Sequence, residues 1–138
     1  MASVFASQLT SIVTEGVFDQ FPATRIALLE SGFTWLPSHM WRFDKEWRNL
    51  RALVPWVKQA PSAYIRQHVR LTVQPLDSPP SLAHMQEIIE QLGSEEMLLY
   101  ASDYPHVHYA DTRTWVADLP SAQAARIGHE NARSWYKL

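Results

Sequence analysis

Three short apolar runs, separated by segments with helical spacing, constrain the fold of this chain more than any other feature. The first run covers residues 26–29, the second spans 69–73 and the third spans 97–100. The first and third runs are continuously apolar, which is typical of strands that are covered on both faces, as in a parallel sheet. The second run alternates apolar with polar residues, and this pattern also predicts a strand.

The segments between these runs repeat their apolar residues at helical spacing, over residues 4–18, 37–50, 82–92 and from 120 to about 136. A shorter helix is expected to begin at Pro61. Pro37 stands where a helix begins, and Gly93 stands just past the end of another. Strands that alternate with helices predict an α/β fold with a parallel sheet.

Length and composition place limits on this fold. The chain has 138 residues, whereas an eight-stranded βα barrel typically takes about 250. We therefore expect a single domain over residues 1–138, with about three βα units. The net charge of −2 provides no basic field for nucleic acid. The absence of cysteine, of a signal peptide and of a membrane-length apolar run favours a cytoplasmic protein without disulfides.

Polar residues follow each predicted strand where an α/β protein carries its active site. Glu30 ends the first strand, Gln74 follows the second and Asp103 follows the third. Because the carboxyl ends of parallel strands meet at one rim, we expect these three side chains to converge.

Asp103 is the foremost candidate for chemistry among them. It lies in the stretch Ser102-Asp103-Tyr104-Pro105-His106, directly after an apolar run. A carboxylate in this position can bind a metal ion or accept a proton. In the alternative interpretation, Ser102 or Asp103 only caps the turn by accepting hydrogen bonds from backbone amides.

Two histidines and a glutamate accompany Asp103. His106 and His108 form an H-x-H pair, which on a strand would turn both imidazoles to one face and suit a metal. Here the pair follows a proline turn, so for His108 we expect a surface or supporting position, and for His106 both interpretations stay open. Glu30 is either a site residue or a partner for Arg25, Arg42 or Arg70.

Several motifs, in the right order along almost the whole chain, resemble the amidohydrolase-related family that contains the aminocarboxymuconate semialdehyde decarboxylase type enzymes. They are Leu29-Glu30-Ser31-Gly32-Phe33, Trp41-Arg42-Phe43-Asp44, Leu71-Thr72-Val73-Gln74-Pro75, Ser102-Asp103-Tyr104-Pro105-His106 and Glu130-Asn131-Ala132-Arg133. The resemblance implies a metal-dependent hydrolase or nonoxidative decarboxylase on a TIM-like (β/α) barrel. It places this chain in the carboxyl-terminal part of that barrel, over strands six to eight.

The resemblance also implies roles for individual residues. In the family a divalent metal, often zinc, is held by an H-x-H pair on strand one, a histidine on strand five and an aspartate on strand eight, and Asp103 matches this last ligand. Glu30 stands where many members carry a histidine, so a carboxylate would handle the proton there. His106 would act in catalysis or hold an anionic small-molecule substrate, together with the planar guanidinium of Arg42.

A metal held by Asp103 alone would be incomplete, because a catalytic zinc site needs about three protein ligands. We therefore expect the remaining ligands to come from a complementary N-terminal half-barrel chain. In the alternative, the chain is a non-catalytic fragment or remnant that forms a homo-oligomer or binds a partner. A sheet of three parallel strands would expose both of its edges, so we expect the isolated chain not to be monomeric.

Overall fold

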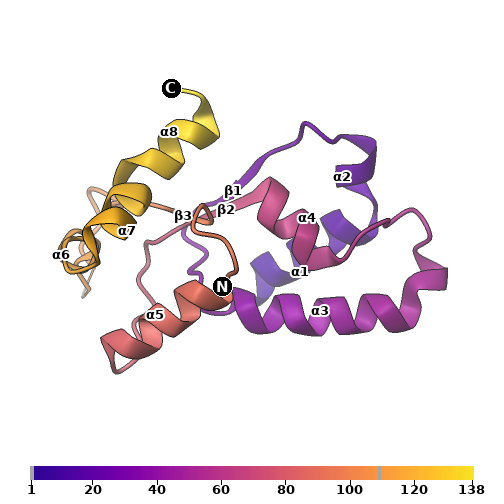
Figure 1. The fold of residues 1–138 in the computed structure, drawn as a ribbon, viewed down its shortest axis with the longest axis horizontal. Coiled ribbons are helices and arrows are strands. Elements are labelled where there is room, and N and C mark those ends of the chain that lie inside the picture. Colours follow the sequence, from indigo (N-terminus) through magenta and orange to yellow (C-terminus); the bar gives the residue numbers. More distant parts are fainter. Residues whose placement is uncertain (1, 109) are drawn as a thin grey trace.

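The computed structural model describes residues 2–108 and 110–138 and contains the predicted parallel sheet (Figure 1). The strands are β1 (Ile26–Leu28), β2 (Val69–Thr72) and β3 (Leu98–Leu99), in the order β1-β2-β3. Ile26 lies opposite Val69, and Leu71 lies opposite Leu98. Both pairings are parallel, which confirms the α/β fold with three consecutive βα units.

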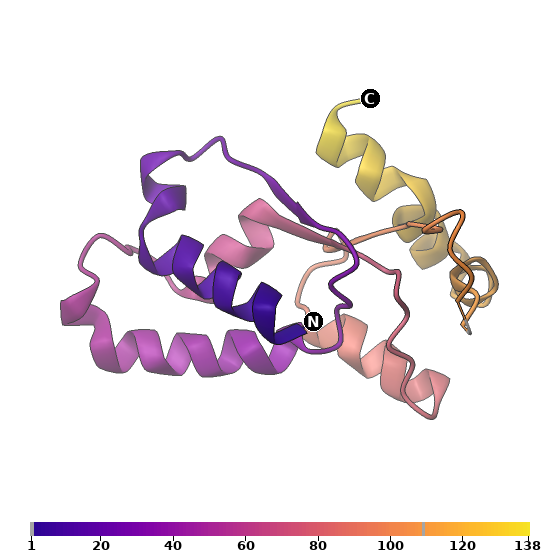
Figure 2. The ribbon, with the colours of Figure 1, turned by 180° about the vertical axis from the view of Figure 1, so that it is seen from behind.

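Helices precede, separate and follow the strands in the predicted order. They are α1 (Ala2–Thr14), α2 (Val17–Gln20), α3 (Leu36–Leu50), the 3-10 helix η1 (Arg51–Leu53), α4 (Pro61–His68), α5 (Leu82–Gln91), α6 (Thr112–Ala117), α7 (Ser121–Ala125), the π-helical η2 (Arg126–Glu130) and α8 (Asn131–Tyr136). In both views α1, α3 and α4 lie at one end of the molecule and α6 to α8 at the other, with the strands between them (Figures 1 and 2). None of the described helices has the length and apolar character needed to cross a membrane.

Two helical segments differ from the prediction. The predicted helix over 4–18 is divided in two, because Gly16 adopts a left-handed backbone with φ 72°. A side chain at Gly16 would also meet the ring of Trp56. The short α6 was not predicted. Its N-cap, Asp111, accepts a hydrogen bond from the backbone N–H of Arg113 at 2.9 Å, so polar capping starts this helix without a long apolar stripe.

The central strand β2 is buried along its whole length, so its alternation of apolar and polar residues does not mark a half-exposed strand. Val69 and Leu71 belong to the apolar core. Arg70, only 6% exposed, lies 4.3 Å from the ring centre of Trp135 and 2.8 Å from a carboxylate oxygen of Glu96. An aromatic ring and an ion pair thus cover the polar side of the strand.

The first strand is less covered than its sequence predicts. All three residues of β1 are only half-buried, and the neighbouring Leu29 side chain is 60% exposed. The predicted cover on both faces is therefore only partial at β1, where Ile26 and Leu28 pack against the apolar core but stay half-buried.

The other outer strand, β3, has its free edge covered by the C-terminal helical region. One side of β3 pairs with β2, where the carbonyls of Met97 and Leu99 accept backbone hydrogen bonds of 2.9 Å. On the other side, the N–H of Tyr100 donates to the Ile127 carbonyl at 2.9 Å. The Asn131 amide nitrogen donates to the Leu98 carbonyl, also at 2.9 Å. The expectation that both sheet edges are exposed is therefore wrong at β3.

Candidate metal centre at the carboxyl ends of the strands

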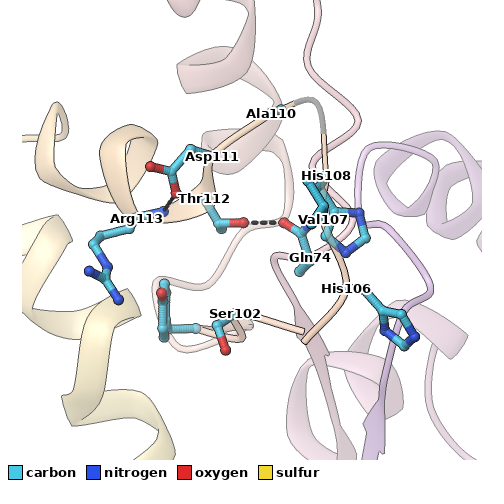
Figure 3. Close-up of a pocket in the computed structure, with 10 residues that line it drawn as sticks. Gln74, Ser102, His106, Val107, His108, Ala110, Asp111, Thr112 and Arg113 are labelled. Carbon is cyan, nitrogen blue, oxygen red and sulfur yellow. Dashed lines mark hydrogen bonds between the residues drawn. The ribbon is translucent and has the colours of Figure 1, made fainter. Parts of the chain in front are cut away.

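The structure brings Glu30, Asp103 and His106 together at the rim where the strands end. Each residue offers one atom capable of binding a metal, and these atoms lie within 4.8 Å of one another. Glu30 follows β1, and the other two residues follow β3. Figure 3 shows the adjoining pocket, into which the loop after β3 places His106 and His108 opposite the start of α6.

Both carboxylate residues of this cluster have an unusual backbone. Glu30 and Asp103 each have a φ of 56°, in the left-handed region that non-glycine residues seldom adopt. The N–H of Glu30 donates to the hydroxyl of Thr72 at 3.1 Å. These sharp turns lie in the loops that follow the two outer strands. Non-glycine residues held in this region are concentrated at functional sites.

The Asp103 side chain binds two imidazoles. Its Oδ1 lies 3.1 Å from Nδ1 of His106, and its Oδ2 lies 2.6 Å from Nε2 of His108, while the side chain is only 16% exposed. The turn is capped by Ser102, whose hydroxyl accepts from the N–H of Tyr104 at 3.3 Å. The capping interpretation therefore describes Ser102, whereas the Asp103 carboxylate is held by the histidines.

These contacts change how the cluster binds protons. The hydrogen bond from His106, followed by that from His108, lowers the pKa of Asp103 below its ordinary value. The same hydrogen bond to Asp103 raises the pKa of His106. Each partner stabilises the charged form of the other, so the pair tends to hold an imidazolium beside a carboxylate.

Glu30 is exposed and forms no ion pair with an arginine in the part of the chain that the structure describes. The three arginines considered as its partners bind elsewhere: Arg25 donates to the Trp135 carbonyl at 2.5 Å, Arg70 pairs with Glu96, and Arg42 pairs with Glu46. This carboxylate is therefore left facing the rim.

Arg42 is the one predicted site residue that the structure does not bring to this rim. It lies on α3, where its Nε is 2.8 Å from a carboxylate oxygen of Glu46 and its side chain is 72% exposed. Arg42 borders a different, mainly apolar pocket of about 380 Å³ between α1, α3 and the segment that follows α3.

The pocket at the rim has a volume of about 310 Å³ and is lined in part by residues that the sequence did not single out. Thr112 and Arg113 begin α6 and line it together with Gln74. They lie well beyond the end of β3, where the expectation about strand ends does not apply. The capping pattern of Asp111 was the available signal for a helix beginning at this point.

Comparison with known proteins agrees with this architecture. A profile of the amidohydrolase family matches residues 2–138. A search of curated protein sequences gave no significant match. Among solved structures, the 5-carboxyvanillate decarboxylase of Sphingomonas paucimobilis is 27% identical, with a TM-score of 0.75, and the match covers 94% of this chain and 38% of that one.

Two further similar structures contain manganese. The dihydroxybenzoic acid decarboxylase of a Polaromonas species, with manganese and the inhibitor 2-nitroresorcinol bound, is 23% identical, with a TM-score of 0.76 and coverage of 99% of this chain and 41% of that one. The 5-carboxyvanillate decarboxylase of Novosphingobium aromaticivorans, complexed with manganese and 4-hydroxy-3-methoxy-5-nitrobenzoic acid, is 22% identical, with a TM-score of 0.75 and coverage of 96% and 38%. This chain thus spans about two fifths of the length of these enzymes.

Proposed function

This chain belongs to the amidohydrolase family, and we propose that it supplies part of a divalent-metal centre that hydrolyses or nonoxidatively decarboxylates a small-molecule acid. The observation that carries the proposal is the convergence of Glu30, Asp103 and His106 within 4.8 Å at the carboxyl ends of parallel strands. Active sites of (β/α) barrels lie at this end of the strands.

The donor atoms of this cluster suit a divalent metal. Two carboxylates and one imidazole are ligands for manganese as well as zinc, and carboxylate oxygen favours the harder manganese ion. Asp103 is the principal ligand in this proposal, with Glu30 and His106 beside it. Manganese is the first metal to test because two of the similar decarboxylases contain it, and zinc is the second.

The chain's own residues would divide the proton chemistry between them. A bound divalent metal would act as a Lewis acid toward an oxygen of the substrate. His106 is held by Asp103 through Nδ1, 3.1 Å away, so its other ring nitrogen, Nε2, would deliver a proton to a substrate atom at the rim or collect one from it. Glu30 offers a carboxylate at the same rim, which could accept a proton from a substrate or water there.

The remaining ligands would come from residues outside this chain. The described cluster contains a single imidazole, and the similar enzymes are more than twice as long as the region matched. The open edge of β1 is the place where a further strand can be added, because the edge of β3 is occupied by Tyr100 and Asn131 contacts. We propose that a complementary cytoplasmic polypeptide pairs along β1 and completes the site beside Glu30.

The alternative is a non-catalytic chain that associates with its own copies. The exposed Leu29 beside the open β1 edge favours this second candidate, because an unpaired edge with an apolar side chain tends to pair with another chain. The two candidates differ in whether a metal-dependent activity accompanies association.

The test is purification of the tagged chain from its native host, followed by metal analysis and measurement of carbon dioxide release from 5-carboxyvanillate and from 2,6-dihydroxybenzoate, which is named in a further similar decarboxylase structure. We expect manganese or zinc, and activity, in the fraction that contains a second polypeptide. The Asp103→Asn variant should associate equally well and lack activity. A complex that contains no metal and turns over neither compound would favour the non-catalytic alternative. Unchanged turnover in Asp103→Asn would contradict the proposed role of this carboxylate.

A further inference from the structure

The polar side chain of Gln74 is buried at the end of β2, beside the candidate metal centre. It is 2% exposed. Its side-chain oxygen accepts a hydrogen bond from the hydroxyl of Thr112, which is itself 4% exposed (Figure 3). Its backbone carbonyl accepts a second hydrogen bond, of 3.1 Å, from the hydroxyl of Thr72. Main chain and side chain are thus both fixed by threonine hydroxyls.

The bond to Thr112 determines which end of the Gln74 amide faces the pocket. Because the hydroxyl donates to Oε1, the amide nitrogen Nε2 is left as the free end, and it can only donate. Within residues 2–108 and 110–138, no acceptor is hydrogen-bonded to this nitrogen. Gln74 lines the pocket of about 310 Å³ that also contains His106 and His108. Because Gln74 lines this pocket, a ligand oxygen in the pocket could accept a hydrogen bond from Nε2.

Arg113 adds a second hydrogen-bond donor to the part of the pocket that Thr112 and Gln74 line. Arg113 follows Thr112 directly, lines the same pocket and lies on the opposite side of Gln74 from His106 in Figure 3. The nearby Asp111 carboxylate is occupied at the start of α6. It accepts from the N–H of Arg113 at 2.9 Å and from the Thr114 hydroxyl at 2.7 Å. This wall of the pocket therefore carries the Arg113 guanidinium as a second donor, beside the Asp111 carboxylate.

We propose that Gln74 determines specificity by donating a hydrogen bond from Nε2 to an oxygen of the bound substrate, and that Thr112 is the positioning residue that keeps the amide in this orientation. The site selects a ligand that carries an acceptor oxygen, such as a carboxylate or phenolate, on the side facing α6. This inference rests on the proposed function, because it assigns a recognition role within the same pocket.

The experiment compares variants in the metal-loaded assembly purified from the native host, with 2,6-dihydroxybenzoate as the probe. Gln74→Glu keeps the shape of the side chain but replaces the donor with a carboxylate. We expect its affinity for the probe to fall about tenfold or more, since losing a matched polar contact in a buried site is strongly discriminating. The affinity for manganese should not fall, because an added carboxylate does not weaken a site for a cation. Gln8→Glu, on the exposed face of α1, is the matched control and should leave both affinities unchanged.

A second pair of variants isolates the orientation of the amide. Thr112→Val removes the hydroxyl that holds Oε1, and we expect probe affinity to fall about threefold to tenfold, as for a single lost hydrogen bond. Thr112→Ser keeps the hydroxyl and should restore most of the affinity. If circular dichroism shows that Gln74→Glu does not fold, the comparison of Thr112→Val with Thr112→Ser tests the role of the Gln74 amide instead.

The possible failures are separable. If the unchanged assembly binds neither manganese nor the probe, the proposed function is wrong and this inference fails with it. If it binds both, but folded Gln74→Glu and Thr112→Val bind the probe within twofold of the unchanged protein, only the role of Gln74 is overturned. Equal losses of probe affinity in Thr112→Val and Thr112→Ser would show that the Thr112 hydroxyl does not hold the Gln74 amide in its orientation.

Discussion

The two outer strands of the sheet, β1 and β3, end in the same way but are completed differently. Each is followed by a carboxylate residue with a φ of 56°. At the β3 end, Asp103 is held by two histidines, and the strand's free edge is covered by the C-terminal helical region. At the β1 end, Glu30 has no arginine partner among the described residues, and the strand's edge is bare. The difference is that the chain covers its own β3 edge and leaves the β1 edge open among the described residues.

The physical basis of the contrast is the cost of leaving backbone groups of an edge strand without partners. Asn131 supplies one amide group that satisfies the carbonyls of both Leu98 and Glu95 at 2.9 Å. No equivalent side chain from the described residues reaches the outer side of β1, where Leu29 is also 60% exposed. Unprotected edges of this kind favour pairing with another strand.

The largest expected effect is on metal affinity, and it should differ between the carboxylates of Asp103 and Glu30. Asp103→Asn should lower the affinity of the purified chain for Mn²⁺ at least tenfold, about 1.4 kcal/mol, because a neutral amide replaces the charged ligand that the histidines orient. Glu30→Gln should lower it less, by about threefold. Isothermal titration calorimetry measures both. Asp118→Asn, an exposed acid at the end of α6, is the control, and equal losses in all three variants would remove the distinction between the strand ends.

The next effect concerns the covered edge of β3. Asn131→Ala removes both hydrogen bonds to the Glu95 and Leu98 carbonyls at a residue that is 6% exposed. The free energy of unfolding should fall by about 2 kcal/mol, since carbonyls near a buried strand lose their donor. Urea denaturation measures this change. Asn49→Ala, on the exposed face of α3, is the control and should lower the free energy of unfolding by less than about 0.5 kcal/mol. A similar loss in both variants would mean that Asn131 does not protect the edge of β3.

A third prediction concerns the open edge of β1. Leu29→Lys places a charge beside the unpaired strand, as natural edge strands do to prevent pairing. We expect the variant to shift from oligomer toward monomer in light scattering at micromolar concentration. Leu53→Lys alters a side chain of similar exposure, 70%, in η1 and away from the sheet, and should not change the association. A purified chain that is already a folded monomer would contradict the proposed role of β1.

The smallest effect is a difference in the pKa of His106, measured by NMR titration of the metal-free chain. The hydrogen bond to Asp103 raises this pKa most, while the charge of Glu30 adds the least of the raising contributions. Asp103→Asn should therefore lower the pKa more than Glu30→Gln does, and the reverse order would contradict the assigned contacts. Because the folded-state pKa lies above the ordinary value of 6.5, the stability contributed by His106 is complete below that pH and is lost as the pH rises through the folded-state pKa.

Features set by local sequence were predictable. Apolar runs gave the strands at 26–28, 69–72 and 98–99, and proline and glycine marked the helix boundaries at Pro37, Pro61 and Gly93. The convergence of Glu30 and Asp103 followed from the rule that parallel strands end at one rim. This rule needs only the order of the elements and no knowledge of their packing.

Features set by packing between distant segments were not predictable in the same way. The burial of Arg70 depends on Trp135 and Glu96, and the cover on β3 depends on Asn131, which lies in the last helix. Arg42 has a charge and shape suited to an anionic substrate, but its neighbour Glu46, one helical turn away, holds it on α3. No periodicity in the sequence records these contacts.

The most direct test of the central claim is X-ray diffraction at the manganese absorption edge from crystals of the chain grown with Mn²⁺. The account predicts an anomalous peak within coordination distance of the Asp103 carboxylate, on the side where Glu30 and His106 converge. A peak bound elsewhere, with Asp103 still held only by His106 and His108, would contradict it.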